Sequence, residues 1–347
     1  MTTTSPAPTS TTLSATLELG RTLVEPALRA AVSRHLCPQL ARVAEYHHGW
    51  VDVDGRPTQR RGGKLVRPAL ALLSTRAAGH AASDGVPAAV AIECVHNFSL
   101  LHDDIMDGDE ERRHRPTAWK VFGVGPAILA GDAMLALAQD ILLEESGPQG
   151  AWAARCLNAA VLRLIAGQGN DLAFEKRDDV PLSECLTMAG DKTAALMACA
   201  CSIGAVYLGA PPALAMSLAG FGAHVGLAFQ LTDDLLGIWG APEITGKPVR
   251  ADLRARKKSL PVVAALTSGT DQARQLSELL ARPDELTEED LVLAAKLVEA
   301  ADGRRWAEAE ADTQLAEAER CLAETDMPDD VRAEFSAIAQ FITTRQS

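Results

Sequence analysis

Hydrophobic positions lie along this chain in long segments with helical character, separated by short breaks rich in glycine and proline. The breaks fall at Gly79–Pro87, Gly147-Pro148, Gly209–Pro212, Pro283 and Pro328. Glycine and proline end helices, because glycine is too flexible and proline cannot donate the next backbone hydrogen bond. No two segments form a convincing strand pair. The pattern therefore predicts an all-α protein.

The helical pattern of the 347-residue chain continues without a clear linker. We therefore expect a single all-helical domain over residues 14–347, although the length could hold two average domains. Residues 1–13 have no basic start and no apolar stretch, which is typical of a disordered tail and not of a signal peptide. The seven cysteines form no CxxC pair and predict reduced thiols in a cytoplasmic protein without a zinc site.

Acidic residues predominate, with a net charge of −13 and a pI near 5.1. This balance disfavours nucleic acid and anionic membrane surfaces as partners. From Thr193 to Thr232 the chain has no Asp, Glu, Lys or Arg, which superficially resembles a two-helix membrane hairpin. The segment is rich in small residues and is flanked by Lys192 and Asp233. We interpret it as a buried part of a large bundle and expect no membrane span.

Two aspartate motifs lie in apolar, helical sequence: LHDDIMD with Asp103, Asp104 and Asp107, and QLTDD with Asp233 and Asp234. Buried carboxylates need a compensating partner. Asp103 and Asp107 are one helical turn apart and point the same way. If Asp233 lies opposite them, these oxygens suit Mg²⁺, which usually binds one or two carboxylates together with substrate phosphates. The motifs therefore predict a phosphorylated ligand.

Cationic residues stand where a diphosphate would need them, namely Lys64, Arg67, Arg112, Arg113, Lys192, Lys247 and Lys257. Gly62-Gly63 allows a close backbone approach before Lys64, and Pro68 suits a first helical turn, so this segment is typical of an anion-binding loop. His96 lies about two turns before Asp103 on one helical face.

In their order and spacing, GGKLVRP, LHDDIMDGDEERR, GDKTA, QLTDDLLG and GKPVRADLRARKKSLP resemble the trans-isoprenyl diphosphate synthases of the polyprenyl synthetase family. The resemblance covers about residues 25–345. It implies the isoprenoid synthase fold, one large all-helical bundle with a central apolar cavity. It also implies a prenyltransferase of isoprenoid biosynthesis with three Mg²⁺ per site, working as a homodimer.

The resemblance also implies roles for individual residues. Isopentenyl diphosphate would be held by Lys64, Arg67, His96 and Arg113, and an allylic prenyl diphosphate by Arg112, Lys192, Thr193 and Lys257. Lys247 would be a further diphosphate contact, Gln230 would lie near the allylic tail, and Gln168 and Asp171 match another family motif. Candidate Mg²⁺ ligands are Asp103, Asp104, Asp107, Asp233 and Asp234. The catalytic set would be Asp103, Asp107, Arg112, Lys192 and Asp233.

Three positions depart from the family pattern. Gly237 stands where most members carry a third aspartate, Leu65 replaces a common arginine, and Arg250-Ala251 replaces a common Gly-Ser. We expect these departures to affect affinity and not the type of reaction, with Gly237 tolerated. The segment from Trp239 to Lys258 is either a lid over bound diphosphate or an ordinary connection.

The chemistry also follows from the residues. Mg²⁺ and Lys or Arg donors stabilise the charge that develops as an allylic C–O bond breaks. The resulting carbocation must be shielded from water and can then be captured by the double bond of isopentenyl diphosphate. No side chain in the motifs is an obvious base, so the released diphosphate is the expected acceptor of the final proton.

Product length would be set by Phe98 and Ser99, five and four residues before Asp103. In the family, an aromatic residue followed by a small one at these positions usually accompanies a C20 product, geranylgeranyl diphosphate. The alternative is farnesyl diphosphate, C15. Two rival functions are a class I terpene cyclase, for which the NDxxSxxxE motif is incomplete here, and a non-catalytic partner subunit, supported only by Gly237.

Overall fold

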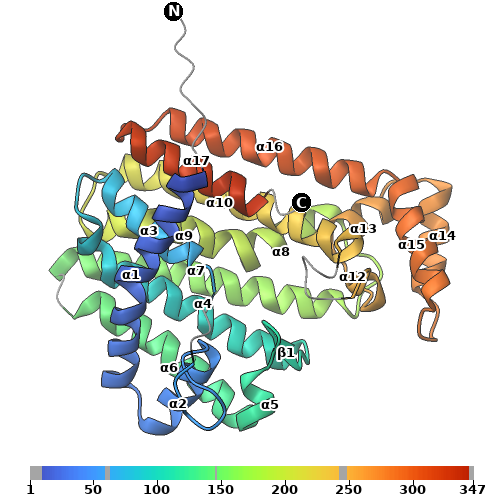
Figure 1. Ribbon diagram of the computed structural model, residues 1–347. Helices are drawn as coiled ribbons and strands as arrows, with labels where there is room; N and C mark the ends of the chain where they lie inside the picture. The colour runs from blue at the N-terminus through green and yellow to red at the C-terminus, as the bar shows by residue number, and fades with distance from the viewer. Residues whose placement is uncertain (1–9, 59–62, 145–146, 242–247, 344–347) are drawn as a thin grey trace, which may run out of the picture. The chain divides into compact units, whose positions relative to one another are not determined.

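The structure, a computed structural model, describes residues 10–58, 63–144, 147–241 and 248–343. These residues are almost entirely α-helical, as the apolar pattern predicted (Figure 1). Cα packing divides the chain into a first unit, Met1–Ala159, Cys199–Ala219 and Glu324–Ile338, and a second unit, Ala160–Ala198, Gly220–Ala323 and Ala339–Ser347. Helices α7 (Gly147–Phe174), α9 (Ala195–Tyr207), α10 (Pro212–Trp239) and α17 (Asp329–Thr343) contribute residues to both units. The single domain over 14–347 remains a prediction.

The first unit also contains α1 (Ser10–His35), α2 (Pro38–His47), α3 (Val66–Ala77), the 3-10 turn η1 (Ala82–Gly85), α4 (Val86–Met106), α5 (Ala118–Phe122) and α6 (Val124–Leu143). Helix α4 packs against α1, α3 and α6. Its first half is buried on almost all sides, because apart from Glu93 its residues are small or apolar. Burial of this kind fixes α4, and with it the aspartate motif at its C-terminal end.

Small residues let the helices of this unit approach closely. A Cβ on Gly204 of α9 would lie 2.3 Å from the carbonyl oxygen of Ala71 in α3. The backbone N–H of Gly204 instead donates to Ser74 Oγ at 3.0 Å. Glycine is therefore required at this contact, and the buried serine is satisfied by it.

The second unit also contains α8 (Leu182–Ala189), the π-helical turn η2 (Gly190–Ala194), α12 (Ala251–Arg254), α13 (Leu260–Leu266), α14 (Asp271–Leu280), α15 (Glu288–Ala300) and α16 (Gly303–Ala323). Helix α13 packs against α8, α14, α15 and α16. Its residues Leu260–Ala265 are all buried, so α13 is a core helix of this unit. A capping box between Thr287 and Asp290 begins α15.

Two local expectations were incomplete. Residues 10–13, expected in the disordered tail, belong to the first turn of α1. Polar residues can begin a helix whose later residues are packed, and Val24 and Leu28 of α1 are buried. A short antiparallel hairpin was also not predicted. Its strands, β1 (Glu111–Arg112) and β2 (Arg115–Pro116), have two residues each. Its sequence has neither β-branched residues nor the Asn-Gly type of turn that signals a hairpin.

Two helices are long and apolar enough to cross a membrane, α6 and α10. In each helix, 39% of the most apolar 18-residue stretch is buried within the protein. Core helices of soluble proteins have the same length and composition, so this finding does not distinguish the two cases. The absence of a membrane span therefore stays a prediction.

Candidate active site

The first aspartate motif lies at the C-terminal end of α4. Asp103 is half-buried, Asp107 caps the helix and is exposed, and Asp104 between them is only 1% exposed. Helical geometry explains the difference, because residues four apart share a face whereas the next residue is rotated by about 100°. Asp103 and Asp107 are therefore the accessible carboxylates of this motif.

Asp104 is engaged by an arginine of the hairpin. Arg112 Nε donates to Asp104 Oδ1 at 2.7 Å, and Arg112 Nη2 lies 2.6 Å from the same oxygen. Burial raises the pKa of Asp104, and the hydrogen bond and charge of Arg112 oppose that shift. Asp104 Oδ2 is buried and has no hydrogen-bond partner among the described residues, so metal binding by Asp104 stays a prediction. Its carboxylate holds Arg112 in place.

Arg67 at the start of α3 and His96 of α4 meet in the first unit, with Arg67 Nη1 3.5 Å from His96 Nε2. Burial, and then the charges of Arg67 and Arg113, hold the pKa of His96 well below its usual value. Glu93 also belongs to this cluster, because Arg67 and Arg113 partly offset the rise that burial causes in its pKa. Sequence reasoning missed Glu93, although a glutamate inside the apolar run AIECV was a visible signal.

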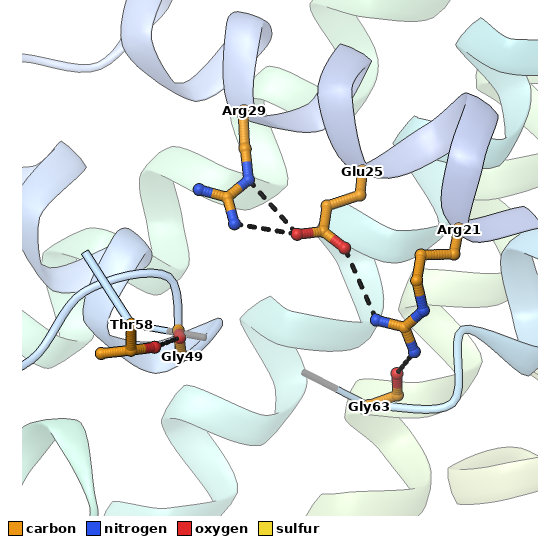
Figure 2. Close-up of polar contacts among 6 residues, drawn as sticks. All are labelled: Arg21, Glu25, Arg29, Gly49, Thr58 and Gly63. Carbon is orange, nitrogen blue, oxygen red and sulfur yellow. Dashed lines mark hydrogen bonds and ion pairs between the residues drawn. The ribbon is translucent and has the colours of Figure 1, made fainter. Parts of the chain in front are cut away.

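The loop before Lys64 is held by α1 (Figure 2). Arg21 Nη2 donates to the carbonyl oxygen of Gly63 at 3.1 Å, and Glu25 forms ion pairs with both Arg21 and Arg29. A Cβ on Gly63 would lie 2.8 Å from Arg113 Nη2. The absence of a side chain thus lets the loop approach Arg113, as expected for an anion-binding loop. Lys64 is exposed, and Gly62 lies outside the described residues.

His47 and His48 line a small cavity in the first unit, together with Asp104, Arg112 and Arg113. Burial, and then Arg113 and Arg29, lower the pKa of His48 to about 3. Its ring stacks on Trp50 with the ring centroids 4.4 Å apart. These contacts indicate that His48 is a packing residue.

The second aspartate motif lies in α10 and repeats the pattern of the first. Asp233 is exposed, whereas Asp234 is 3% exposed. Gln230 Nε2 donates to Asp234 Oδ1 at 2.8 Å, and the backbone N–H of Leu260 donates to Asp234 Oδ2 at 2.8 Å. Burial raises the pKa of Asp234 to about 6. Each oxygen of Asp234 thus accepts one protein hydrogen bond, and its role as a metal ligand stays a prediction.

The π-helical turn η2 carries Lys192 and Thr193. A π-turn holds one more residue than an α-helical turn and commonly marks a functional site. Lys192 Nζ contacts Asp171 Oδ2 at 2.5 Å, and Thr193 Oγ1 donates to Gln230 Oε1 at 2.6 Å. A Cβ on Gly167 of α7 would lie 2.3 Å from the backbone nitrogen of Lys192. The glycine of the GQGND segment therefore lets α7 approach this turn, a role that sequence reasoning missed.

Lys257 lies among the acidic residues of the second unit. Burial would lower the pKa of Lys257, but the charges of Asp234, Asp252, Asp171 and Asp233 outweigh it and raise the pKa. The structure thus brings Lys192, Thr193, Gln230 and Lys257 into one network with the second motif. Gln168 is buried, and its side-chain amide has no hydrogen-bond partner among the described residues. Lys247 lies outside the described residues, as does part of the expected lid.

Among the described residues, no group of three His, Cys, Asp or Glu side chains could hold a metal ion. The accessible carboxylates are Asp103 and Asp107 in the first unit and Asp233 in the second. Hard oxygen donors of this kind fit Mg²⁺, which keeps several waters and takes further oxygens from phosphates. The donor set is thus consistent with magnesium held partly by a substrate.

Comparison with known proteins agrees with this chemistry. Residues 55–298 match the family model described as polyprenyl synthetase. The chain is 47% identical over 336 residues to a (2E,6E)-farnesyl diphosphate synthase of Mycobacterium tuberculosis, covering 95% of this chain and 93% of the relative. It is 42% identical over 338 residues to a geranylgeranyl diphosphate synthase of the same organism, covering 95% of each.

Two solved structures are similar to this chain. A polyprenyl synthetase from Streptomyces coelicolor has a TM-score of 0.91 and 52% identity, covering 96% of this chain and 100% of that one. A geranylgeranyl pyrophosphate synthase from Corynebacterium glutamicum, complexed with isoprenyl diphosphate and magnesium, has a TM-score of 0.81 and 28% identity, covering 96% and 99%. The chain therefore belongs to the polyprenyl synthetase family and is a short-chain trans-isoprenyl diphosphate synthase.

Proposed function

We propose that this prenyltransferase condenses isopentenyl diphosphate with an allylic prenyl diphosphate in a Mg²⁺-dependent reaction whose main product is geranylgeranyl diphosphate. The observation that carries the proposal is the pairing of an accessible aspartate with nearby cations in each unit. Asp103 lies next to Asp104, which pairs with Arg112, and the charge of Asp233 contributes to the raised pKa of Lys257. Magnesium in the complex of the Corynebacterium glutamicum relative supports the metal. We propose three Mg²⁺ per site on the family resemblance.

Each cluster has a chemical task in this proposal. Arg67, Arg113 and His96 bind the diphosphate of isopentenyl diphosphate. Arg112, Lys192 and Lys257 stabilise the negative charge that develops on the departing allylic diphosphate. Asp103, Asp107 and Asp233 would hold Mg²⁺, which would supply further positive charge to that leaving group. Thr193 and Gln230, which are hydrogen-bonded to each other, line the allylic side, and the released diphosphate accepts the final proton.

The proposed C20 product rests on α4. Phe98 and Ser99 are 6% and 8% exposed, and Phe98 packs edge-to-face on His102 with ring centroids 4.8 Å apart. A fixed aromatic ring beside a small side chain would stop a growing chain at a defined depth. Farnesyl diphosphate is the second candidate product, because the relative with 47% identity carries that name.

Purified protein with Mg²⁺, labelled isopentenyl diphosphate and dimethylallyl, geranyl or farnesyl diphosphate in turn tests this proposal. Chromatography of dephosphorylated products should show C20 as the main product. Products that stop at C15 would favour the farnesyl alternative, and a cyclised hydrocarbon would favour a terpene cyclase. No product with any primer would overturn the proposed activity and support a partner subunit.

We also propose a cytoplasmic homodimer. In the first unit, large apolar side chains are exposed along α6 and the start of α7, namely Val124, Ile128, Leu129, Leu143 and Trp152. Exposed apolar patches of this kind are typical of interaction surfaces. Sedimentation equilibrium should give twice the chain mass of 36.7 kDa. A monomer over the micromolar range would contradict the proposal.

A further inference from the structure

Arg21 joins helix α1 to the loop before Lys64. Its side chain is 20% exposed, and its Nη2 donates to the carbonyl oxygen of Gly63 at 3.1 Å. Its Nη1 lies 3.5 Å from Glu25 Oε2, one turn further along α1 (Figure 2). The guanidinium group is planar and rigid, so a contact at one nitrogen also orients the others. Glu25 therefore holds the guanidinium of Arg21 in the direction of the loop.

The position of Arg21 is set by the packing of α1 on α3. A Cβ on Gly20, the residue before Arg21, would lie 3.3 Å from Ala69 Cβ and 3.4 Å from Ala69 Cα. The two helices are thus in close contact at this point, and Val24 on the next turn of α1 is fully buried. Ala69 lies in the first turn of α3, directly after the loop. This contact therefore places Arg21 beside the loop.

The loop enters α3 through an uncommon backbone conformation. Leu65, the N-cap of α3, has φ 52° and ψ 37°, and its side chain makes no capping hydrogen bond. A leucine with positive φ is strained and persists only where the surrounding structure fixes it. Gly63 is fixed in this way, because its carbonyl oxygen accepts from Arg21 and its Cα faces the guanidinium of Arg113. Lys64 lies between Gly63 and Leu65, so its direction depends on both.

The contact with Arg21 also fixes the orientation of one peptide plane. In a trans peptide, the carbonyl of one residue and the N–H of the next point in opposite directions. The Gly63 carbonyl points to Arg21 on α1, so the backbone N–H of Lys64 points away from α1. Backbone N–H groups are the donors with which loops at helix N-termini bind anions. The guanidinium also offsets the partial negative charge of the Gly63 carbonyl, which would repel a diphosphate.

We infer that Arg21 is a positioning residue for isopentenyl diphosphate. By holding the carbonyl of Gly63, it keeps residues 63–65 in the conformation that presents the backbone and side chain of Lys64 to the diphosphate. This inference rests on the proposed function, in which the loop before α3 belongs to the site for isopentenyl diphosphate. Arg21 acts through the loop and is not itself a ligand of the substrate.

Steady-state kinetics of substitutions in α1 tests this inference. In Arg21→Met, which keeps an unbranched stem and loses the guanidinium, we expect KM for isopentenyl diphosphate to rise about tenfold. KM for the allylic diphosphate and kcat should change by less than about twofold, because the loop is distant in sequence from the aspartate motifs and Arg21 does not contact them. Arg21→Lys keeps the charge but not the planar group and should raise KM for isopentenyl diphosphate about threefold.

Arg29→Met is the matched control. Arg29 lies on the same helix and pairs with the same carboxylate of Glu25 at 2.8 Å. Its guanidinium lies over the ring of Trp50, 4.4 Å from the centroid, and its printed contacts do not include the loop. Both KM values in Arg29→Met should stay within about twofold of wild type. A rise in KM for isopentenyl diphosphate equal to that in Arg21→Met would contradict a specific role of Arg21.

A second substitution tests whether Arg21 acts through the backbone of the loop. Asparagine adopts positive φ more readily than leucine, so Leu65→Asn should make the turn less dependent on Arg21. In the Leu65→Asn background, Arg21→Met should raise KM for isopentenyl diphosphate only about threefold relative to Leu65→Asn alone. A full tenfold rise in that background would show that Arg21 does not act through this turn.

Calorimetric titration with isopentenyl diphosphate separates failure of this inference from failure of the proposed function. Wild-type protein that binds no isopentenyl diphosphate would overturn the proposed function, and the inference with it. Binding by wild type and Arg21→Met with equal affinity would overturn the inference alone. Equal losses of affinity for both substrates, in step with a lower melting temperature, would show a merely structural role for Arg21 and would also overturn it.

Discussion

At the scale of single residues, the two members of each Asp-Asp pair differ in burial, and they differ in the same way in both pairs. Asp103 and Asp233 are accessible, while their neighbours Asp104 and Asp234 are buried and accept protein hydrogen bonds. The sequence predicts that both motifs are functional, because carboxylates in apolar helices need partners. It does not distinguish the members of a pair, since which one is buried depends on the helices packed around them.

This division predicts different consequences for adjacent substitutions. Asp103→Asn should lower kcat at least about 100-fold, or about 3 kcal/mol, because a ligand of the metal that stabilises the leaving group is lost. Asp104→Asn should instead raise KM for the allylic diphosphate, because Arg112 loses its counter-charge. Steady-state kinetics over a range of Mg²⁺ concentrations measures both. More than about a tenth of wild-type kcat in Asp103→Asn at saturating Mg²⁺ would contradict its role as a metal ligand.

At the scale of elements, α4 combines several tasks along one helix. Its residues include His96, Phe98 and Ser99 before the aspartates, so the residues proposed for substrate contact, product length and metal binding all lie on one helix. The sequence predicts that these residues lie along one helix, because helical periodicity depends only on nearby residues. The sequence does not predict the π-turn that carries Lys192, because a single extra residue in a helix leaves the apolar pattern unchanged.

Substitutions in α4 should change the length of the product. Ser99→Phe adds an aromatic ring one turn before Asp103 and should shift the product from C20 toward C15. Phe98→Ala removes the ring that packs on His102 and should give chains longer than C20. Chromatography of dephosphorylated products from the two variants decides the matter. Unchanged product distributions in both would show that α4 does not set the length.

At the scale of the whole molecule, the predicted helix breaks match the structure, because glycine and proline act through local geometry. Two of the features that sequence reasoning missed depend on the approach of segments that are separated in the chain. Gly167 meets the π-turn, and Asp252 fills the space beside Gly237. The assignment of the polyprenyl synthetase family was confirmed, whereas the roles of the site residues remain predictions.

The free energy of unfolding of the whole chain at acidic pH should depend on His48. Its pKa is about 3 in the folded protein against a usual value of 6.5, because the ring is buried near Arg113 and Arg29. Between these values only the unfolded chain binds the proton, so the free energy of unfolding falls by up to about 1.4 kcal/mol per pH unit as pH decreases below 6.5. His48→Phe keeps the stack on Trp50 and should remove this contribution. Urea unfolding of both proteins from pH 7 to pH 5 measures the difference, and parallel pH dependences would contradict it.

The carboxylate of Asp252 beside Gly237 also has a consequence for comparisons among relatives. A Cβ at position 237 would lie 2.3 Å from Asp252 Oδ2, so a protein with a larger residue at 237 must turn or move the side chain at 252. A difference between two relatives at position 237 should therefore appear in their structures as a changed side-chain position in the segment after α10, as well as in α10 itself.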